Sequence, residues 1–181
     1  MNIAELFNAI KKYRMSPEAY ARSIGVKIGK NCDIATRNFG SEPFLITIGD
    51  HVQVTTGVSF VTHDGGVWIF RDIDPTFDVF GKIKIGSNTY VGNNTTILPG
   101  VTIGENCVIG ACSLVTKSIP DNTVTAGVPC RFISSKEDYY KNMSKINAKT
   151  KLMKWDDKKQ AITALSDEKL IQKNLLTTEK D

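Results

Sequence analysis

Aliphatic residues return at every sixth position through the middle of the chain, and glycine directly follows most of them. The six that keep this interval without a break are Ile85, Val91, Ile97, Ile103, Ile109 and Val115. The same interval joins Ile28 to Ile34, and it joins Ile48, Val54 and Phe60. A helix repeats every 3.6 residues and a strand every two, so neither element alone accounts for a period of six.

A three-sided solenoid accounts for this period, because each hexad is then one short strand with its turn and three hexads complete one coil. The aliphatic side chain points inward and stacks on its counterpart in the next coil, at the ladder spacing of about 4.8 Å. The fifth position of each hexad is mostly small, as a narrow interior requires: Thr89, Thr95, Val101, Cys107, Ser113 and Ile119. We therefore predict a mainly β, parallel coil with Cys107 in its core.

The repeat is broken twice, over residues 40–47 and, at greater length, over residues 64–84. Insertions in a solenoid become loops on one face, which is often the binding face. The longer loop carries aromatic residues among aspartates: Trp68, Phe70, Phe77 and Phe80 with Asp72, Asp74 and Asp78. Two hypotheses stay open for the aromatic side chains, stacking against a sugar and packing against a neighbouring subunit.

Helices are expected on both sides of the coil, because all fourteen glycines lie between residues 25 and 127. Residues 1–22 predict two short helices, the first with Asn2 and Glu5 as a capping box and the second with Ser16 as its N-cap. A loose helical stripe in the tail consists of Ile162, Leu165, Leu170 and Ile171. The predicted organisation is an N-terminal helical segment (1–22), a β-helix domain (23–133) with a loop at 64–84, and a C-terminal helical extension (134–181).

Composition and charge narrow the class of protein. Of 181 residues, 41% are hydrophobic and 23% charged, which excludes wholesale disorder, and no run of about 18 apolar residues predicts a membrane span. Residues 23–133 carry eight basic and nine acidic residues, so we expect no nucleic-acid partner. The tail from residue 134 carries eleven basic and eight acidic residues, which favours a solvated helix face, with weak attraction to an acidic surface as the alternative.

Cysteine usage favours reduced thiols rather than disulfides or a zinc site. The four cysteines, at positions 32, 107, 112 and 130, form neither a CxxC motif nor a cluster with histidine. No secretory signal is visible at the N-terminus, so we expect a cytoplasmic protein with free thiols and no metal. The sequence contains two histidines, His51 and His63.

The stretch from Ile83 to Ile133 resembles a known family. It reads IKIGSNTYVGNNTTILPGVTIGENCVIGACSLVTKSIPDNTVTAGVPCRFI and is similar to the C-terminal half of galactoside, maltose and nodulation-type O-acetyltransferases. The segment FVTHDGG, from Phe60 to Gly66, is more similar to capsule, lipopolysaccharide and xenobiotic acetyltransferases. The resemblance covers residues 24–133 and implies a left-handed parallel β-helix, acetyl-CoA as the donor and a hydroxyl group as the acceptor.

The resemblance also implies that His63 is the general base, because the family's catalytic histidine precedes an excursion loop. His63 ends its hexad and opens the long loop. A sugar hydroxyl is a poor nucleophile while it is protonated, and a neutral imidazole can remove its proton as it attacks the thioester. Such catalysis contributes roughly 10²–10⁴-fold. His51 lies in a regular hexad turn with no adjacent loop, which predicts a surface residue.

Coenzyme-binding residues carry over from the family one by one. Asn93 and Ala111 match corners that contact the pantetheine arm, Thr116 and Lys117 match residues that hold the nucleotide end, and Arg131 matches a basic residue at the phosphates. Lys and Arg suit that task chemically. The chain departs from some relatives at Ser134, where they have a second basic residue, and at Tyr90, where many have Trp. No acceptor-binding residue of the galactoside enzymes finds a match in RNFGSEPF, residues 37–44.

The resemblance suggests a homotrimer with active sites shared between subunits, acting on a sugar or polysaccharide-precursor hydroxyl by direct transfer. Alternative functions are acetylation of a streptogramin- or chloramphenicol-type drug and a non-catalytic β-helix scaffold. A γ-class carbonic anhydrase shares the solenoid but needs three zinc-bound histidines, and this chain has two. A serine acetyltransferase is disfavoured because those enzymes have a larger N-terminal helical domain.

Overall fold

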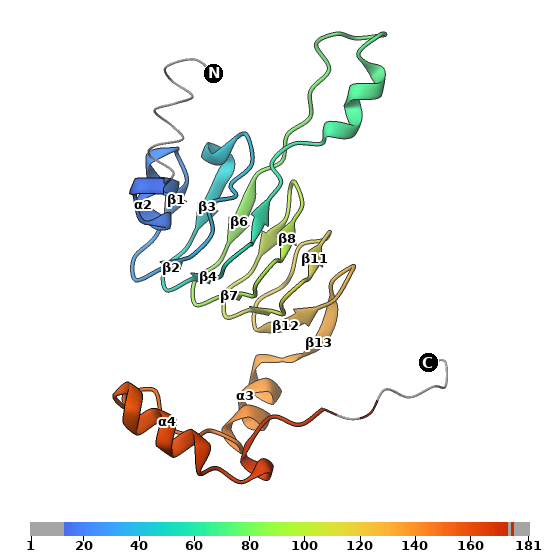
Figure 1. Cartoon of the computed structure of the whole chain (residues 1–181). Helices are drawn as coiled ribbons and strands as arrows, with labels where there is room; N and C mark the ends of the chain where they lie inside the picture. Colours follow the sequence, from blue (N-terminus) through green and yellow to red (C-terminus); the bar gives the residue numbers. More distant parts are fainter. Residues whose placement is uncertain (1–12, 174, 176–181) are drawn as a thin grey trace. The chain divides into compact units, whose positions relative to one another are not determined.

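The structure is a computed structural model that describes residues 13–173 and 175 (Figure 1). It divides into two compact units, Met1–Lys136 and Glu137–Asp181. Within the described part of the chain, no helix is long and apolar enough to cross a membrane.

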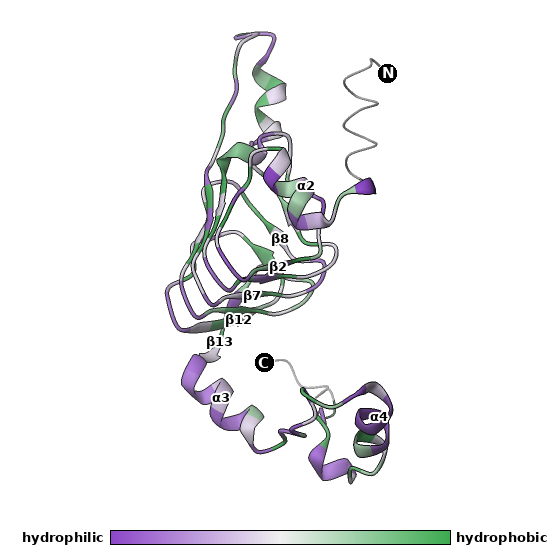
Figure 2. Ribbon diagram, turned by 90° about the vertical axis from the view of Figure 1, so that its left-hand side faces the viewer, coloured by the Kyte–Doolittle hydropathy of each residue, from purple (hydrophilic) through white to green (hydrophobic). Residues whose placement is uncertain are grey.

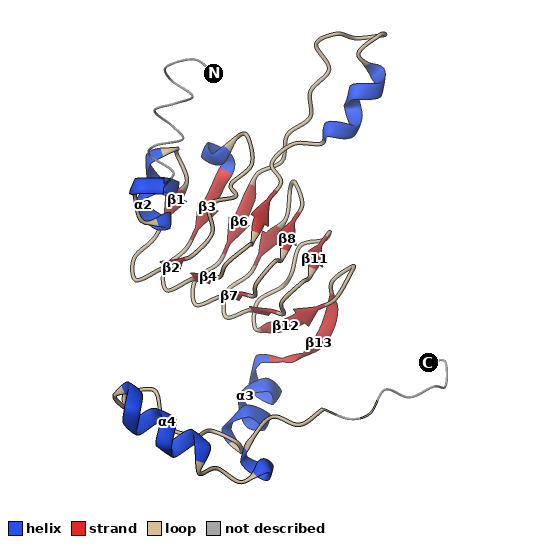
Figure 3. Ribbon diagram, in the orientation of Figure 1, coloured by secondary structure: helices blue, strands red, loops and turns tan. Residues whose placement is uncertain are grey.

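Short strands form three sheets, which are the three faces of the coil in the first unit (Figure 3). Sheet A contains β1 (Lys27–Ile28), β3 (Ile46–Ile48), β6 (Ile83–Ile85) and β9 (Thr102–Ile103). Sheet B contains β2 (Asp33–Ile34), β4 (Gln53–Val54), β7 (Tyr90–Val91), β10 (Val108–Ile109), β12 (Thr123–Ala126) and β13 (Arg131–Ser135). Sheet C contains β5 (Ser59–Phe60), β8 (Thr96–Ile97) and β11 (Leu114–Val115). Every pair is parallel except β12 with β13, which is an antiparallel hairpin, so the predicted mainly β, parallel coil is confirmed. Its left hand stays a prediction.

The register of the strands explains the period of six. Ile85 pairs with Ile103, one coil of 18 residues later. Ile48 pairs with Ile85, 37 residues later, because the long loop is inserted into that coil. The aliphatic column is buried, and so is the fifth position of each hexad, with Cys107 only 1% exposed. Truncating one of these isoleucines to alanine would cost about 2–5 kcal/mol of stability, since a close-packed interior cannot fill the cavity.

Polar residues in the narrow interior are hydrogen-bonded, which explains why a coil tolerates them. The hydroxyl of Thr89 donates to the carbonyl of Gly104, and that of Thr95 donates to the carbonyl of Gly110. A buried hydroxyl without a partner would cost about 1–3 kcal/mol. These threonines therefore join consecutive coils from within instead of weakening them.

Both breaks in the repeat leave the coil at the corner between sheet C and sheet A. The first contains the short helix η1 (Pro43–Leu45). The second contains η2 (Gly65–Phe70) and projects well away from the coil (Figure 1). The two ends of this loop pair as an antiparallel ribbon, in which Asp64 N–H donates to Val79 and Gly81 N–H donates to Thr62. Apolar side chains on it are exposed, including Trp68 at 70%, and Figure 2 shows hydrophobic stretches along it.

The flanking segments are helical in part. Helix α2 (Pro17–Ser23) begins where predicted, with the Ser16 hydroxyl accepting from the N–H of Ala19 at 3.3 Å. The first predicted helix, with Asn2 and Glu5, lies outside the described residues. The second unit holds α3 (Lys136–Ser144), α4 (Trp155–Thr163) and η3 (Asp167–Lys169).

The single helical stripe predicted in the tail is wrong. Of its four residues, Ile162 lies in α4, whereas Leu165, Leu170 and Ile171 follow the end of that helix at Thr163. They still gather in space, because all four line one shallow apolar groove with Met143 and Ile146.

Candidate active site

His63 is held in place by the paired stems of the long loop. It forms an isolated antiparallel bridge with Phe80, and the two rings meet edge to face with their centroids 6.5 Å apart. Its side chain is 38% exposed, so the imidazole is supported on one side and open to solvent on the other. A histidine held at the mouth of a loop in this way is accessible to a substrate without being free to turn.

The neighbour of this histidine is Glu42 in the first excursion, a residue that no sequence motif marks. Glu42 Oε2 lies 3.1 Å from Nδ1 of His63, and Ser41 Oγ lies 3.3 Å from the same nitrogen. A carboxylate can only accept a hydrogen bond, so the neutral imidazole carries its proton on Nδ1. The lone pair is then on Nε2, where the imidazole could accept a proton.

Thr62 fixes the carboxylate of Glu42. The buried Thr62 hydroxyl donates to Glu42 Oε2 at 2.7 Å and accepts from the backbone N–H of Glu42 at 3.3 Å. The hydrogen bond from Thr62 is the main cause that lowers the pKa of Glu42 below its ordinary value of 4.5. Burial opposes it as the second-largest effect, and the hydrogen bond and charge of His63 and a hydrogen bond with Ser41 lower the pKa further. Glu42 is therefore ionised near neutral pH and able to orient the imidazole.

An open cleft of about 260 Å³ lies in front of this pair. Its lining residues are Glu42, His63, Gly65, Trp68, Arg71, Asp78 and Phe80. A Cβ atom on Gly65 would come within 3.8 Å of Nε2 of His63, so glycine keeps the space beside this nitrogen clear. Arg71 and Asp78 form an exposed ion pair at 3.3 Å. The pair places a cation that donates hydrogen bonds and an anion that accepts them beside the aromatic side chains of the cleft. These groups match the mixed polar and apolar surface of a saccharide.

Two of the five predicted coenzyme residues meet in a second cleft. Lys117 and Arg131 both line it, and its volume is about 470 Å³. The β12–β13 hairpin brings them together, because Cys130 N–H donates to the carbonyl of Leu114 and so ties the hairpin to β11. The hydroxyl of Thr125, in the lining of the same cleft, is buried and finds no partner within the described residues. Two cations beside an unsatisfied hydroxyl are suited to an anionic ligand rich in oxygen.

Asn93 and Ala111 lie on consecutive coils at the corner between sheets B and C. The carbonyl of Asn93 accepts from the N–H of Cys112, directly after Ala111. The coils approach closely here, since a Cβ atom on Gly92 would be 2.6 Å from the backbone nitrogen of Ala111. Both side chains are exposed, so this corner offers backbone and small polar groups to a ligand lying along it.

The described chain does not bring His63 and the coenzyme residues into one cleft. None of Asn93, Ala111, Thr116, Lys117 and Arg131 lines the cleft of His63. Thr116 follows β11 and is exposed next to Lys117. Within one chain, the candidate base and the candidate donor-binding surface are separate.

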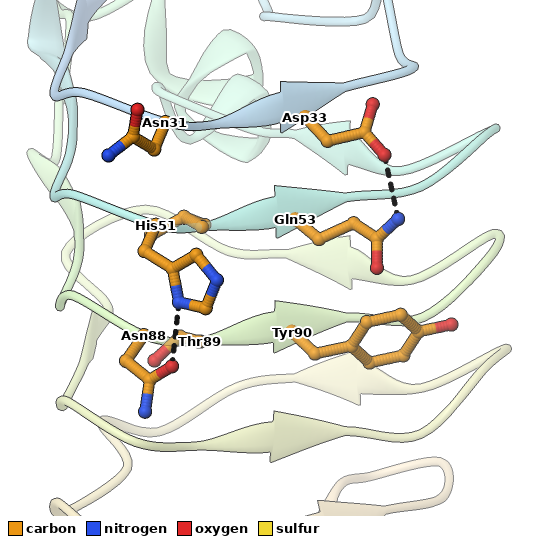
Figure 4. Close-up of a pocket in the computed structure, with 8 residues that line it drawn as sticks. Asn31, Asp33, His51, Gln53, Asn88, Thr89 and Tyr90 are labelled. Atoms are coloured by element: carbon orange, nitrogen blue, oxygen red, sulfur yellow. Dashed lines mark hydrogen bonds between the residues drawn. The ribbon is translucent and has the colours of Figure 1, made fainter. Parts of the chain in front are cut away.

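His51 occupies a different surface, as expected. It lies at the corner between sheets A and B, where one residue per coil adopts a positive φ: Asn31, His51, Asn88, Asn106 and Asn122. His51 Nδ1 is 2.8 Å from Asn88 Oδ1, and the amide of Asn88 donates to Asn106. Figure 4 shows three members of this column, Asn31, His51 and Asn88, which line a shallow groove with Asp33, Gln53 and Tyr90. His51 thus belongs to a structural ladder of corner side chains.

The cysteines lie apart from the cleft of His63. Cys107 is in the core, where burial raises the pKa of its thiol above the ordinary value of 9.0, and Cys112 is exposed on the corner beside Ala111. Cys32 and Cys130 are half-buried, and none of the four lines that cleft. Among the described residues, no three His, Cys, Asp or Glu side chains are close enough to hold a metal ion together.

Comparison with known proteins gives a consistent set of relatives. The family described as bacterial transferase hexapeptide (six repeats) matches residues 82–117. Protein CapG of Staphylococcus aureus is 46% identical over 158 residues, which cover 86% of this chain and 91% of CapG. Galactoside O-acetyltransferase of Escherichia coli (strain K12) is 36% identical over 123 residues, covering 67% of this chain and 60% of that protein.

A solved structure supports the same relationship. The structure of a galactoside acetyltransferase in complex with coenzyme A superposes with a TM-score of 0.54 at 28% sequence identity. The superposition covers 75% of this chain and 82% of that one. The similarity therefore extends over most of the coil, well beyond the six repeats.

Proposed function

We propose, from the premise that the chain is an acyltransferase and belongs to the bacterial hexapeptide-repeat transferases, that it transfers an acetyl group from acetyl-CoA to a hydroxyl of a saccharide. The observation that carries this proposal is the pairing of His63 with an ionised Glu42 at an open cleft. The relatives supply the reaction class, since one is named a galactoside O-acetyltransferase and a solved galactoside acetyltransferase holds coenzyme A.

The pair is suited to deprotonating a hydroxyl. Nε2 of His63 takes the proton of the acceptor as its oxygen attacks the thioester carbonyl. The imidazolium that forms is stabilised by Glu42, whose negative charge lies 3.1 Å from Nδ1. The same proton then serves the departing thiolate, so the C–O bond forms, the C–S bond breaks, and free coenzyme A leaves as a thiol.

The donor is assigned to the surface that begins at Asn93 and Ala111 and ends at Arg131. Lys117 and Arg131 would bind the phosphates of acetyl-CoA, since both line one cleft of sufficient size for a nucleotide end. Asn93 and Ala111 would contact the pantetheine arm along the close-packed corner of the coil. Thr116 lies next to Lys117 and would join it at the nucleotide end.

A complete site requires a second subunit. His63 and the donor-binding surface do not share a cleft in one chain, and the projecting loop exposes Trp68, Ile69 and Ile73. Closed three-fold symmetry would let each loop reach the donor surface of a neighbour and would cover these apolar side chains. We therefore assign the active sites to the interfaces of a homotrimer.

The acceptor is assigned to the cleft of His63, where Trp68 and Phe80 are suited to the apolar face of a sugar and Arg71 and Asp78 to its hydroxyls. The test is a screen of acceptors with acetyl-CoA in which the release of free thiol is recorded. It includes monosaccharides, oligosaccharides, nucleotide sugars, chloramphenicol and a streptogramin, with a control that has no acceptor. Thiol release that depends on a saccharide is the expected result. Release with the drugs alone would contradict the acceptor class, and failure to bind acetyl-CoA by calorimetry would point to a scaffold.

A further inference from the structure

The second unit contains a stretch of unusual charge between α3 and α4. Between Asp138 and Asp156 the chain has five lysines and no acidic residue. The lysines are Lys141, Lys145, Lys149, Lys151 and Lys154. Aromatic and aliphatic residues lie among them, so the stretch is both basic and apolar. Its most exposed part, Lys149–Trp155, is called the basic loop here.

Apolar side chains of the basic loop are exposed to an unusual degree. A turn closed by the hydrogen bond from Met153 N–H to the carbonyl of Thr150 places Leu152 at its tip, where this side chain is 99% exposed. Trp155, the first residue of α4, is 75% exposed, and Met153 is 45% exposed. Burial of a leucine or a tryptophan is favourable, so a partner that covered both side chains would gain from the hydrophobic effect.

The apolar groove of the second unit is built without these three side chains. The apolar groove of that unit is lined by Met143, Ile146, Ala148, Ile162, Leu165, Lys169, Leu170 and Ile171. Leu152, Met153 and Trp155 are absent from this lining. The basic loop is therefore available to bind something else.

The surroundings of the basic loop favour an anionic partner. From Tyr139 to Gln160 the chain carries seven lysines against two aspartates, Asp156 and Asp157. Lys158 and Lys159 directly follow these two acids and offset them. The side chains of Lys149, Lys151 and Lys154 are all exposed.

An anionic lipid surface fits this combination better than a soluble polyanion. Lysines alone would suffice for a nucleic acid or an acidic polysaccharide, but neither would remove Leu152 from water. Leucine and tryptophan between lysines are the composition of segments that lie in the membrane interface. The lysines pair with anionic headgroups while the apolar side chains enter the acyl boundary.

We propose that the basic loop binds the surface of an anionic lipid bilayer, with Leu152 and Trp155 inserted between the headgroups and Lys149, Lys151 and Lys154 on the lipid phosphates. The binding is peripheral, since it needs one loop and no membrane-spanning helix. It would hold the enzyme beside acceptors that are carried on lipid. That consequence rests on the proposed function, whereas vesicle binding does not.

The test is co-sedimentation of the full chain with vesicles, compared for phosphatidylcholine alone and for phosphatidylcholine mixed with phosphatidylglycerol. We expect binding to the mixed vesicles that weakens as salt is raised. The triple variant Lys149→Gln/Lys151→Gln/Lys154→Gln should bind about 100-fold more weakly, since each lysine near an anionic surface contributes about five-fold. The matched control Lys27→Gln/Lys30→Gln/Lys84→Gln removes the same charge from the coil and should bind like the unmodified protein.

Insertion is read from the fluorescence of Trp155 in a Trp68→Phe background, because these are the two tryptophans of the chain. We expect a blue shift with mixed vesicles, no shift with heparin, and at least about ten-fold weaker vesicle binding for Leu152→Ser/Trp155→Ser. The proposal is wrong if mixed vesicles leave the emission unshifted, if both triple variants lose binding equally, or if the full chain stays in the supernatant.

Discussion

Glu42 and His63 are neighbours in space, with 3.1 Å between Oε2 and Nδ1, although Glu42 lies in the first excursion of the coil and His63 directly precedes the second. The two excursions leave the coil at the same corner, one coil apart. Thr62, which directly precedes His63, donates a hydrogen bond to the carboxylate of Glu42. This geometry makes Glu42 a positioning residue for the candidate base, and it can be tested separately from the base itself.

Replacing Glu42 by glutamine should lower kcat by about 10- to 100-fold with little change in KM, because the amide keeps the shape but not the charge that favours the imidazolium. A purely structural defect would not confine the loss to kcat. The control is Glu105→Gln, which removes an exposed carboxylate remote from the cleft. An unchanged kcat in Glu42→Gln would show that the carboxylate does not act on the base.

The pKa of Glu42 is lowered chiefly by the Thr62 hydroxyl, and this shift predicts how the stability of the protein depends on pH. A carboxyl whose pKa is lowered by folding stabilises the protein above its unfolded pKa, and that contribution is lost as the pH falls through the lower folded value. In urea unfolding, the stability difference between the unmodified protein and Glu42→Gln should be constant well above pH 4.5 and should narrow below it. A difference that stays the same from neutral to strongly acidic pH would contradict the hydrogen-bonded carboxylate.

The coil could be predicted from the sequence because each hexad repeats the same local rule. Inward Ile103, buried Cys107 and the place of His63 at a loop mouth all follow from the repeat and its breaks. Lys117 and Arg131 are 14 positions apart, and the β12–β13 hairpin places both in the lining of one cleft, whereas their role at the coenzyme stays a prediction.

Glu42 could not be predicted, because its segment has no motif and its position depends on how the first excursion returns to the coil. That return is tight: a Cβ atom on Gly40 would be 2.8 Å from Thr62 Oγ1. Both breaks in the repeat fall at one corner, however, and this places an acidic residue of the first break near the histidine that opens the second. The tail stripe is wrong for a local reason, since α4 ends at Thr163 and the separate short helix η3 (Asp167–Lys169) lies between Leu165 and Leu170.

No cysteine should carry the acetyl group. Cys112 and Cys130 lie away from His63, and the remaining two thiols do not line its cleft either. We therefore expect the double variant Cys112→Ala/Cys130→Ala to keep turning over, with sequential kinetics in two-substrate measurements. Ping-pong kinetics together with an isolable acetyl-cysteine would require a different mechanism.

Shared active sites should be revealed by mixing two inactive variants. His63→Ala lacks the base, and Lys117→Glu/Arg131→Glu lacks the cations of the donor-binding cleft. If neighbouring chains complete each site, unfolding and refolding the two together should restore part of the activity, because some interfaces then pair an intact His63 with an intact donor surface. Each variant refolded alone is the control. A mixture as inactive as its parts would place the whole site within one chain.

The two histidines of the chain allow a direct test of whether His63 is the general base. With the acceptor found in the screen, kcat and the affinity for acetyl-CoA are compared for His63→Ala and for His51→Asn, which gives position 51 the asparagine found at the other corners of its ladder. We predict a loss of at least about 10²-fold in kcat for His63→Ala with donor affinity unchanged, and nearly full activity for His51→Asn. Full activity in His63→Ala, with His51→Asn equally active, would contradict the assignment of the base.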